Sequence, residues 1–215
     1  MRSALIPILA LVIFLAVIPV AHGGSVTSKL TAAELEKVKG GEIILKKDID
    51  GKTKSGSGIA YGVFKCDLDA FWSVLFDYDH YPKIFPRLNW VKVIEKTPNR
   101  IVVTFSMDAT LKDLEYTTLN NLSQDKKRLD FKFDERFPHS YQKSLVGYWQ
   151  LEEIEPGLLL AEYKLGVALD IPLIGKIIEK IVLNMSTKDL PDVLISIRKR
   201  IDSGGIWTRN QDEKK

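Results

Sequence analysis

Apolar and polar side chains alternate, residue by residue, through six successive segments in the middle of the chain. A period of two puts the apolar side chains on one face of a β-strand, so each segment is predicted to be a strand that buries one face. The segments cover residues 90–96, 101–108, 114–122, 128–135, 143–153 and 158–169. The links between them are short and carry turn residues such as Pro156-Gly157, which suits hairpins and leaves no room for helical crossovers. The sequence therefore predicts an antiparallel meander of six strands.

A further hairpin and a short helix are predicted ahead of the meander. Residues 42–47 and 59–65 have the strand pattern, and the glycine-rich segment 51–58 between them is predicted to be a flexible turn. Thr31 and Glu34 have the spacing of a capping box, which favours a short helix that stops at the following pair of glycines. The whole sheet is thus expected to have about eight strands.

Three other segments have apolar residues at helical spacing. Asp67 can cap a helix over residues 68–76, and the pattern returns in residues 171–182 and 190–201 before the glycines at 203–205 end it. A curved sheet wrapped around one long amphipathic helix is not filled by that helix, so we expect an internal apolar cavity. The predicted fold class is α+β, a curved antiparallel β-sheet that grips a long C-terminal α-helix.

The charge and the cysteine content exclude several classes of function. The 31 Lys and Arg residues against 28 Asp and Glu give a net charge of +3, and the two signs are interspersed, so a nucleic-acid partner is not expected. One cysteine excludes an intrachain disulfide and a cysteine-based metal cluster, and three histidines leave little for a zinc site. We expect no metal, no cofactor and a monomeric protein.

The N-terminal segment has the plan of a secretory signal peptide. Arg2 precedes an apolar run over residues 4–20, and the small residues Ala21 and Gly23 suit a cleavage site after Gly23. The alternative is an uncleaved membrane anchor, because about 17 apolar residues lie at the short end of what spans a bilayer. Export to the periplasm with cleavage is the favoured interpretation, and transient contact with a membrane would then depend on apolar surface.

Two motifs carry a resemblance to a known superfamily. The pattern Asp-x-x-x-Tyr-Pro-x-x-x-Pro begins at Asp77, and a Gly-x-Trp strand at residues 147–149 is joined through a Pro-Gly turn to a strand that contains Tyr163. With these motifs the chain resembles the START-like (SRPBCC) superfamily, which includes polyketide cyclases/dehydrases and coenzyme Q-binding START-domain proteins. The resemblance spans roughly residues 55–202 and implies a helix-grip fold that holds a hydrophobic small molecule or lipid.

The chain is accordingly predicted to divide into four parts. These are the signal peptide (1–23), the N-terminal helix with the first strand (24–54), the START-like helix-grip domain (55–202) and a flexible tail (203–215).

Candidate ligand-binding residues are those whose strand face or helix stripe would look into the cavity. They are Phe105, Met107, Tyr116, Phe131, Phe133, Trp149, Tyr163, Ile174, Ile178, Val193, Leu194 and Ile197. Arg136 is a candidate head-group contact, against the alternative of an ordinary surface charge. The apolar segment 171–182, together with the C-terminal helix, is predicted to gate the mouth of the cavity, unless it lies in the core.

Two main classes of function stay open. The first is a non-catalytic carrier or sensor of a hydrophobic ligand such as a lipid, a sterol-like molecule or a quinone. The second is a polyketide cyclase or dehydratase that uses the same cavity. Acid–base candidates such as Glu115, Asp134 and His139 have no diagnostic spacing, so no catalytic residue is assigned and the carrier is favoured. A module that binds another protein through its sheet edge is a third, weaker alternative.

Overall fold

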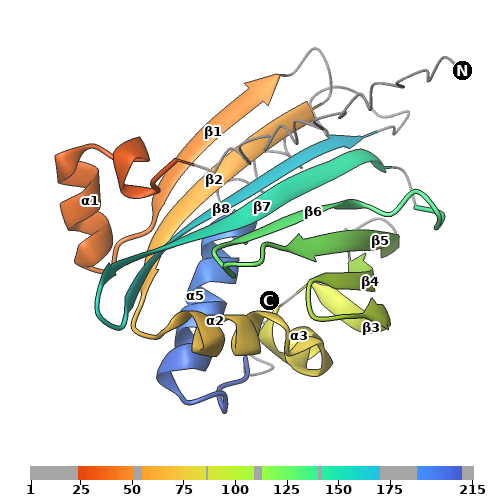
Figure 1. Cartoon of the computed structure of the whole chain (residues 1–215). Helices are drawn as coiled ribbons and strands as arrows, with labels where there is room; N and C mark the ends of the chain where they lie inside the picture. Colours follow the sequence, from red (N-terminus) through yellow and green to blue (C-terminus); the bar gives the residue numbers. More distant parts are fainter. Residues whose placement is uncertain are drawn as a thin grey trace, which may run out of the picture.

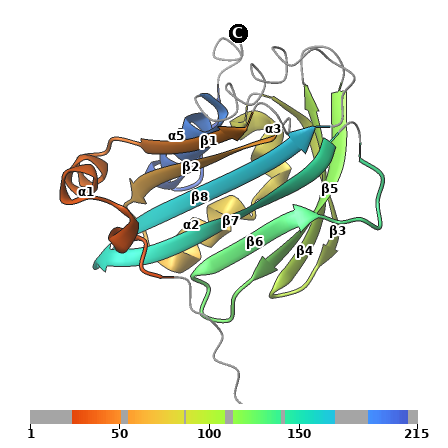
Figure 2. The same ribbon diagram turned by 90° about the horizontal axis from the view of Figure 1, so that it is seen from above.

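The computed structural model of the chain describes residues 24–50, 55–85, 87–108, 113–139, 142–169 and 188–209. In this part of the chain a curved β-sheet curls around helices that lie against one of its faces (Figures 1 and 2). The predicted signal peptide (1–23) and the predicted gate (171–182) lie outside the described residues. No helix in the described part is long and apolar enough to cross a membrane.

The sheet has eight antiparallel strands in the order β1-β2-β8-β7-β6-β5-β4-β3. They are β1 (Ile44–Asp50), β2 (Ser55–Phe64), β3 (Leu88–Lys96), β4 (Arg100–Asp108), β5 (Asp113–Leu122), β6 (Arg128–Phe133), β7 (Gln142–Glu155) and β8 (Leu158–Leu169). Strands β3 to β8 follow one another along the chain as neighbours, which confirms the predicted meander. Because β2 pairs with β8, the opening hairpin extends the sheet beyond the last strand of the meander.

The start of β2 differs from the sequence prediction. The strand begins at Ser55 rather than at Ile59, so residues 55–58 of the predicted flexible turn (51–58) are strand. Gly56 and Gly58 pair with β8 on one side and with β1 on the other. The hydrogen-bonded neighbours on both sides override the weak strand preference of glycine and serine.

The helices of the described part are short. They are η1 (Thr27–Lys29), α1 (Ala32–Lys39), α2 (Leu68–Leu75), η2 (Tyr78–His80), α3 (Tyr81–Ile84) and α5 (Leu190–Asp202). The capping box predicted for α1 is present, since Thr31 and Glu34 each bond the other's backbone N–H through a side chain. Asp67 caps α2 as predicted, and its Oδ1 accepts a hydrogen bond of 2.7 Å from the Ala70 N–H.

Helices α2 and α5 lie against the concave face of the sheet (Figure 2). Their apolar stripes are buried there. The helix side chains in this core are Phe71, Trp72, Leu75, Leu190, Leu194 and Ile197. Among the described elements, α5 lies mainly against β2 and α2. Gly62 of β2 allows this close approach, because a Cβ there would lie 2.9 Å from Cδ2 of Leu194.

The N-terminal segment packs on the opposite, convex face. Val26 and Val38 are buried together with Tyr61 of β2 and Leu160 of β8. In both strands these residues alternate with members of the inner core, so they point the other way. Figure 2 shows α1 apart from α2, α3 and α5. The sheet is therefore covered on both faces near β2 and β8.

An ion pair ties the end of α5 to the loop after α2. Arg200 donates one hydrogen bond to Asp77 Oδ2 and another to the Trp207 carbonyl, both at 2.8 Å. His80 Nδ1 lies 2.7 Å from Asp77 Oδ1. Burial acts to raise the pKa of the Asp77 carboxyl, but the bonds from His80 and Arg200 outweigh burial and lower that pKa. Trp207, which lies within the segment predicted as a tail (203–215), is thus bonded to α5.

Acid should weaken this ion pair. Because the pKa of Asp77 in the folded protein lies below its usual 3.8, the pair stabilises the fold above that pH, and the stabilisation is lost as the pH falls through the lowered pKa. Asp77→Asn should cost about 2 kcal/mol near neutral pH, less than the 3 to 5 kcal/mol typical of fully buried pairs, since Asp77 is partly exposed. Urea titration of both proteins at about pH 7 and about pH 3 should show this difference shrinking in acid. A difference that stays constant would contradict the assignment.

Candidate functional site

Aromatic side chains gather on the concave face of the sheet, and one group spans β4, β5 and β6. Phe105 and Tyr116 are directly paired across β4 and β5, and their ring centroids lie 5.4 Å apart. The ring of Phe133 follows at 6.1 Å from Tyr116, and His139 stacks on Phe133 at 4.6 Å. These rings form a continuous aromatic strip across three strands.

A second aromatic group spans β6, β7 and β8. Tyr163 lies flat on Trp149, with centroids 4.1 Å apart and planes inclined by 9°. Phe131 reaches to 6.2 Å from Tyr163 across β7, because Gly147 between them has no side chain. A Cβ at Gly147 would lie 2.4 Å from Cζ of Phe131 and 2.1 Å from the carbonyl oxygen of Lys164. The glycine in this strand is therefore required by the ring that lies over it.

Side-chain exposure separates the predicted site residues into two sets. Four are buried in the packed core and are 0 to 6% exposed, namely Phe133, Trp149, Leu194 and Ile197. Six keep part of their surface accessible although they belong to the concave face or to the helix that packs on it, namely Phe105, Met107, Tyr116, Phe131, Tyr163 and Val193. The first set holds the fold together. The second set contains the residues that a ligand inside the sheet could touch.

The remaining predicted site residues lie elsewhere. Ile174 and Ile178 are outside the described residues, as is the gate to which they were assigned. Arg136 lies just after β6, where its guanidinium bonds Asp134 at 2.6 Å and Glu95 at 2.9 Å. The hydrogen bonds to both carboxylates raise its pKa. The structure thus places Arg136 in a surface ion-pair network.

The acid–base candidates lie in different surroundings, since Asp134 is paired with Arg136 whereas His139 stacks on Phe133. Glu115 precedes Tyr116 on β5 and so points to the opposite face. No group of three or more His, Cys, Asp or Glu side chains among the described residues is placed to hold a metal ion. Burial raises the pKa of Cys66 to about 11, which keeps this thiol protonated and unreactive near neutral pH.

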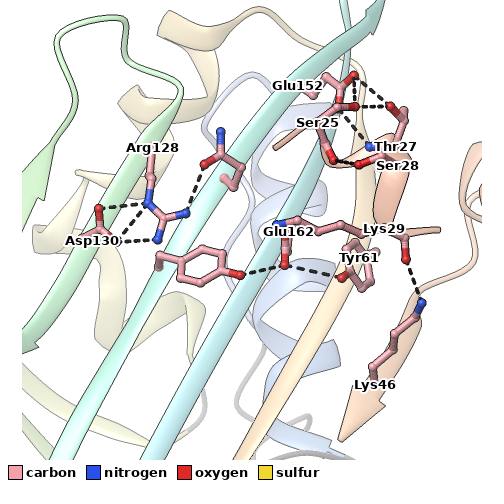
Figure 3. Close-up of polar contacts among 12 residues, drawn as sticks. Ser25, Thr27, Ser28, Lys29, Lys46, Tyr61, Arg128, Asp130, Glu152 and Glu162 are labelled. Atoms are coloured by element: carbon pink, nitrogen blue, oxygen red, sulfur yellow. Dashed lines mark hydrogen bonds and ion pairs between the residues drawn. The ribbon is translucent and has the colours of Figure 1, made fainter. Parts of the chain in front are cut away.

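A polar cluster lies on the convex face around the buried carboxylate of Glu162 (Figure 3). The hydroxyls of Tyr148 and Tyr61 donate to Oε1 of Glu162 at 2.8 and 3.4 Å, and Nζ of Lys29 donates to Oε2 at 2.5 Å. A carboxylate that is 1% exposed needs such partners, because burying an unpaired charge costs several kcal/mol. Lys29 comes from η1, so the cluster fastens the N-terminal segment to the sheet.

A neighbouring carboxylate also fastens the N-terminal segment to the sheet. Glu152 of β7 accepts hydrogen bonds of 2.9 Å from the Ser25 hydroxyl, the Thr27 N–H and the Thr27 hydroxyl (Figure 3). Arg128 lies over the ring of Tyr148 at 3.9 Å and is paired with Asp130. Since these charges are matched within the protein, we assign the convex cluster to folding and keep the concave face as the candidate site.

Solved structures with the same architecture define the class of fold. The STAR-related lipid transfer protein from Xanthomonas axonopodis has a TM-score of 0.62 and 9% identity over 74% of this chain and 93% of its own. The Zhui aromatase/cyclase from Streptomyces sp. R1128 has a TM-score of 0.59 and 13% identity, over 77% and 100%. Human STARD10 has a TM-score of 0.60 and 14% identity, over 75% and 69%. The protein therefore has the helix-grip fold of START proteins, as predicted.

The family is established from the sequence. A family model described as polyketide cyclase/dehydrase and lipid transport matches residues 66–194, which is more than half of the chain. The chain belongs to this family, which lies within the START-like (SRPBCC) superfamily that the sequence motifs indicate. No curated protein matches the chain.

Proposed function

We propose that this protein binds an apolar small molecule or lipid against the concave face of its sheet and carries it without chemical change. The proposal depends on one observation, the six site residues that belong to the concave side and keep accessible surface. Burial raises the pKa of one of them, Tyr116, to about 12, so its ring is surrounded by protein while part of its surface stays accessible. We infer that such side chains border an internal space that can hold the ligand.

The family supports this function and also the main alternative. Its description names lipid transport beside polyketide cyclase and dehydrase, and one structural relative is a STAR-related lipid transfer protein. A carrier needs no catalytic group, and Glu115, one of the acid–base candidates, points away from the concave face. A cyclase or dehydratase would release a ligand whose mass or ring count differs from that of the molecule bound, so product analysis separates the two functions.

Export is part of the same proposal. Residues 1–23 act as a signal peptide, and the mature protein shuttles its ligand through the periplasm with transient membrane contact. An apolar molecule crossing an aqueous compartment needs a shielded site, and the proposed concave site meets this need. An uncleaved anchor remains the alternative, and N-terminal sequencing of exported protein distinguishes the two, with Gly24 as the expected first residue.

Two adjacent residues of β7 allow a sharp test of the site. Leu145 and Val146 point to opposite faces, and Leu145 shares the concave face with Trp149. Leu145→Asp should weaken binding of the apolar dye Nile red by about tenfold or more. The new carboxylate would have to lose its hydration when the dye binds, and that loss costs free energy. Val146→Asp should leave binding unchanged, since Val146 is 57% exposed on the convex face. Fluorescence titration of the dye measures both affinities.

The stability of each variant is the control. Thermal unfolding should show Leu145→Asp still folded at the temperature of the titration, and the affinity is compared only under that condition. Equal affinities of the two folded variants would contradict binding at the concave face. A loss of affinity in Val146→Asp alone would indicate that the dye binds at the convex face instead.

A further inference from the structure

Two phenol hydroxyls on the concave face have no hydrogen-bond partner among the described residues. They belong to Tyr116 on β5 and Tyr163 on β8, whereas the nearby Tyr81 donates its hydroxyl proton to the Leu75 carbonyl. Polar groups inside proteins are almost always paired, with protein or with another molecule. Two unpaired donors among aromatic rings thus leave hydrogen-bonding capacity for a ligand.

The curvature of the sheet brings these two phenols toward the same region. On a flat sheet, β5 and β8 would be three strand spacings apart, about 14 Å. In the folded protein the ring of Tyr116 lies 6.1 Å from Phe133 and that of Tyr163 lies 6.2 Å from Phe131, and these two phenylalanines are neighbours on one face of β6. Asp189 directly precedes the first residue of α5, which belongs to the same core cluster as Tyr163. The two phenols therefore border the same part of the concave face, and Asp189 lies at the helix start that packs beside Tyr163.

The carboxyl of Asp189 is held by an arginine. Asp189 immediately precedes α5 but makes no side-chain capping bond to that helix. Arg87, just before β3, donates from Nη1 to Oδ2 of Asp189 at 3.3 Å. Burial raises the pKa of Asp189, the positive charge of Arg87 opposes this rise, and the weaker effects of Asp192 and Lys188 have opposite signs. The ion pair near Tyr163 thus has balanced charges.

These observations define the chemistry of a polar contact point inside an apolar site. Two phenols offer protons to an acceptor oxygen, and a balanced ion pair offers no net attraction to an anion. We propose that Tyr116 and Tyr163 hold a neutral acceptor oxygen of the ligand, such as a ketone or ester carbonyl. This inference rests on the proposed function and adds the polar group that the ligand must have. A free carboxylate is disfavoured there, because the balanced pair supplies no net positive charge to offset the cost of burying it.

Isosteric variants and matched probes test the proposal. Tyr116→Phe and Tyr163→Phe remove one hydroxyl each and keep the ring, and Tyr148→Phe does the same on the convex face as a control. The probes are 2-dodecanone, dodecane and dodecanoate, measured by displacement of Nile red at neutral pH. We expect each concave variant to bind 2-dodecanone about fivefold to tenfold more weakly than the wild type. Binding of dodecane should be unchanged in all three variants.

Several results would overturn the proposal. One is an affinity for 2-dodecanone that is equal in the wild type, Tyr116→Phe and Tyr163→Phe while thermal unfolding shows all three to be folded. Another is dodecanoate binding to the wild type more tightly than 2-dodecanone. An equal loss of dodecane and 2-dodecanone in Tyr163→Phe would also overturn it, because the hydroxyl would then act on packing rather than on the carbonyl.

Failure of the inference is distinguishable from failure of the proposed function. If the wild type binds Nile red and dodecane displaces the dye, the apolar site exists, whatever affinity is measured for 2-dodecanone. If Nile red does not bind at all, the proposed function fails, and the inference fails with it.

Discussion

Replacing Trp72 by alanine is expected to lower the free energy of unfolding by about 3 to 5 kcal/mol, the range for truncating a buried aromatic side chain. Trp72 is 4% exposed, and its ring stacks on Phe76 and meets Phe71 edge to face. Its Nε1 donates a hydrogen bond of 2.7 Å to the carbonyl of Lys126, in the turn between β5 and β6. The variant loses both this packing and the hydrogen bond that joins α2 to that turn. Guanidinium titration followed by circular dichroism measures the loss.

Trp90 supplies the control for this prediction. It lies on the edge strand β3 and is 41% exposed, so Trp90→Ala should cost less than about 1 kcal/mol. A similarly small cost for Trp72→Ala would mean that α2 does not pack against the sheet through this face.

A methyl group at Gly147 should be among the most disruptive small changes in the chain. Gly147→Ala would place a Cβ 2.1 Å from the carbonyl oxygen of Lys164 and 2.4 Å from the ring of Phe131. A backbone oxygen cannot swing aside as a flexible side chain can, so β7 and β8 must separate locally. We expect a loss of about 3 kcal/mol or more, at or above the upper end for overpacked cores. Denaturant titration measures it, and a shift in the melting temperature supports it.

The matched control lies in the next strand. A Cβ at Gly166 would meet its nearest atoms at 3.5 Å or beyond, which is ordinary van der Waals contact. Gly166→Ala should therefore change stability by less than about 1 kcal/mol. Equal effects of the two substitutions would contradict the close packing of Phe131 over β7.

The strands of the meander were predictable because apolar residues of the buried face alternate with polar residues of the other face along each strand. In β8, Leu159 and Ala161 belong to the inner core while Leu160 and Glu162 point outward, so the alternation reports a real difference in surroundings. The start of β2 was not predictable in this way. Its glycines and serines give no apolar alternation, and only the pairing of residues such as Gly58 with β8 makes them strand.

The candidate site was predictable in outline but not in detail. Alternation assigns Trp149 and Tyr163 to the same face, and they are indeed paired and stacked. It does not say that Trp149 is buried, since this depends on α2, where Phe71 lies 5.6 Å from its ring. A residue in a strand carries no local sign of which helix will cover it.

The polar contacts were missed for a related reason. Arg87 and Asp189 are 102 positions apart, and Lys29 and Glu162 are 133 apart. An acidic residue at an outward position of a strand, such as Glu162, looks like an ordinary solvent-facing residue. Only the docking of the N-terminal segment buries it and gives it a cationic partner.

Native mass spectrometry of the protein purified from its own cells without detergent tests the central claim most directly. We predict a species heavier than the chain by the mass of one apolar molecule, which organic extraction removes. The extra mass should be retained in Val146→Asp and lost in Leu145→Asp. A wild-type protein that carries no extra mass, and that takes up neither dodecane nor 2-dodecanone when these are added, would contradict a ligand-binding function.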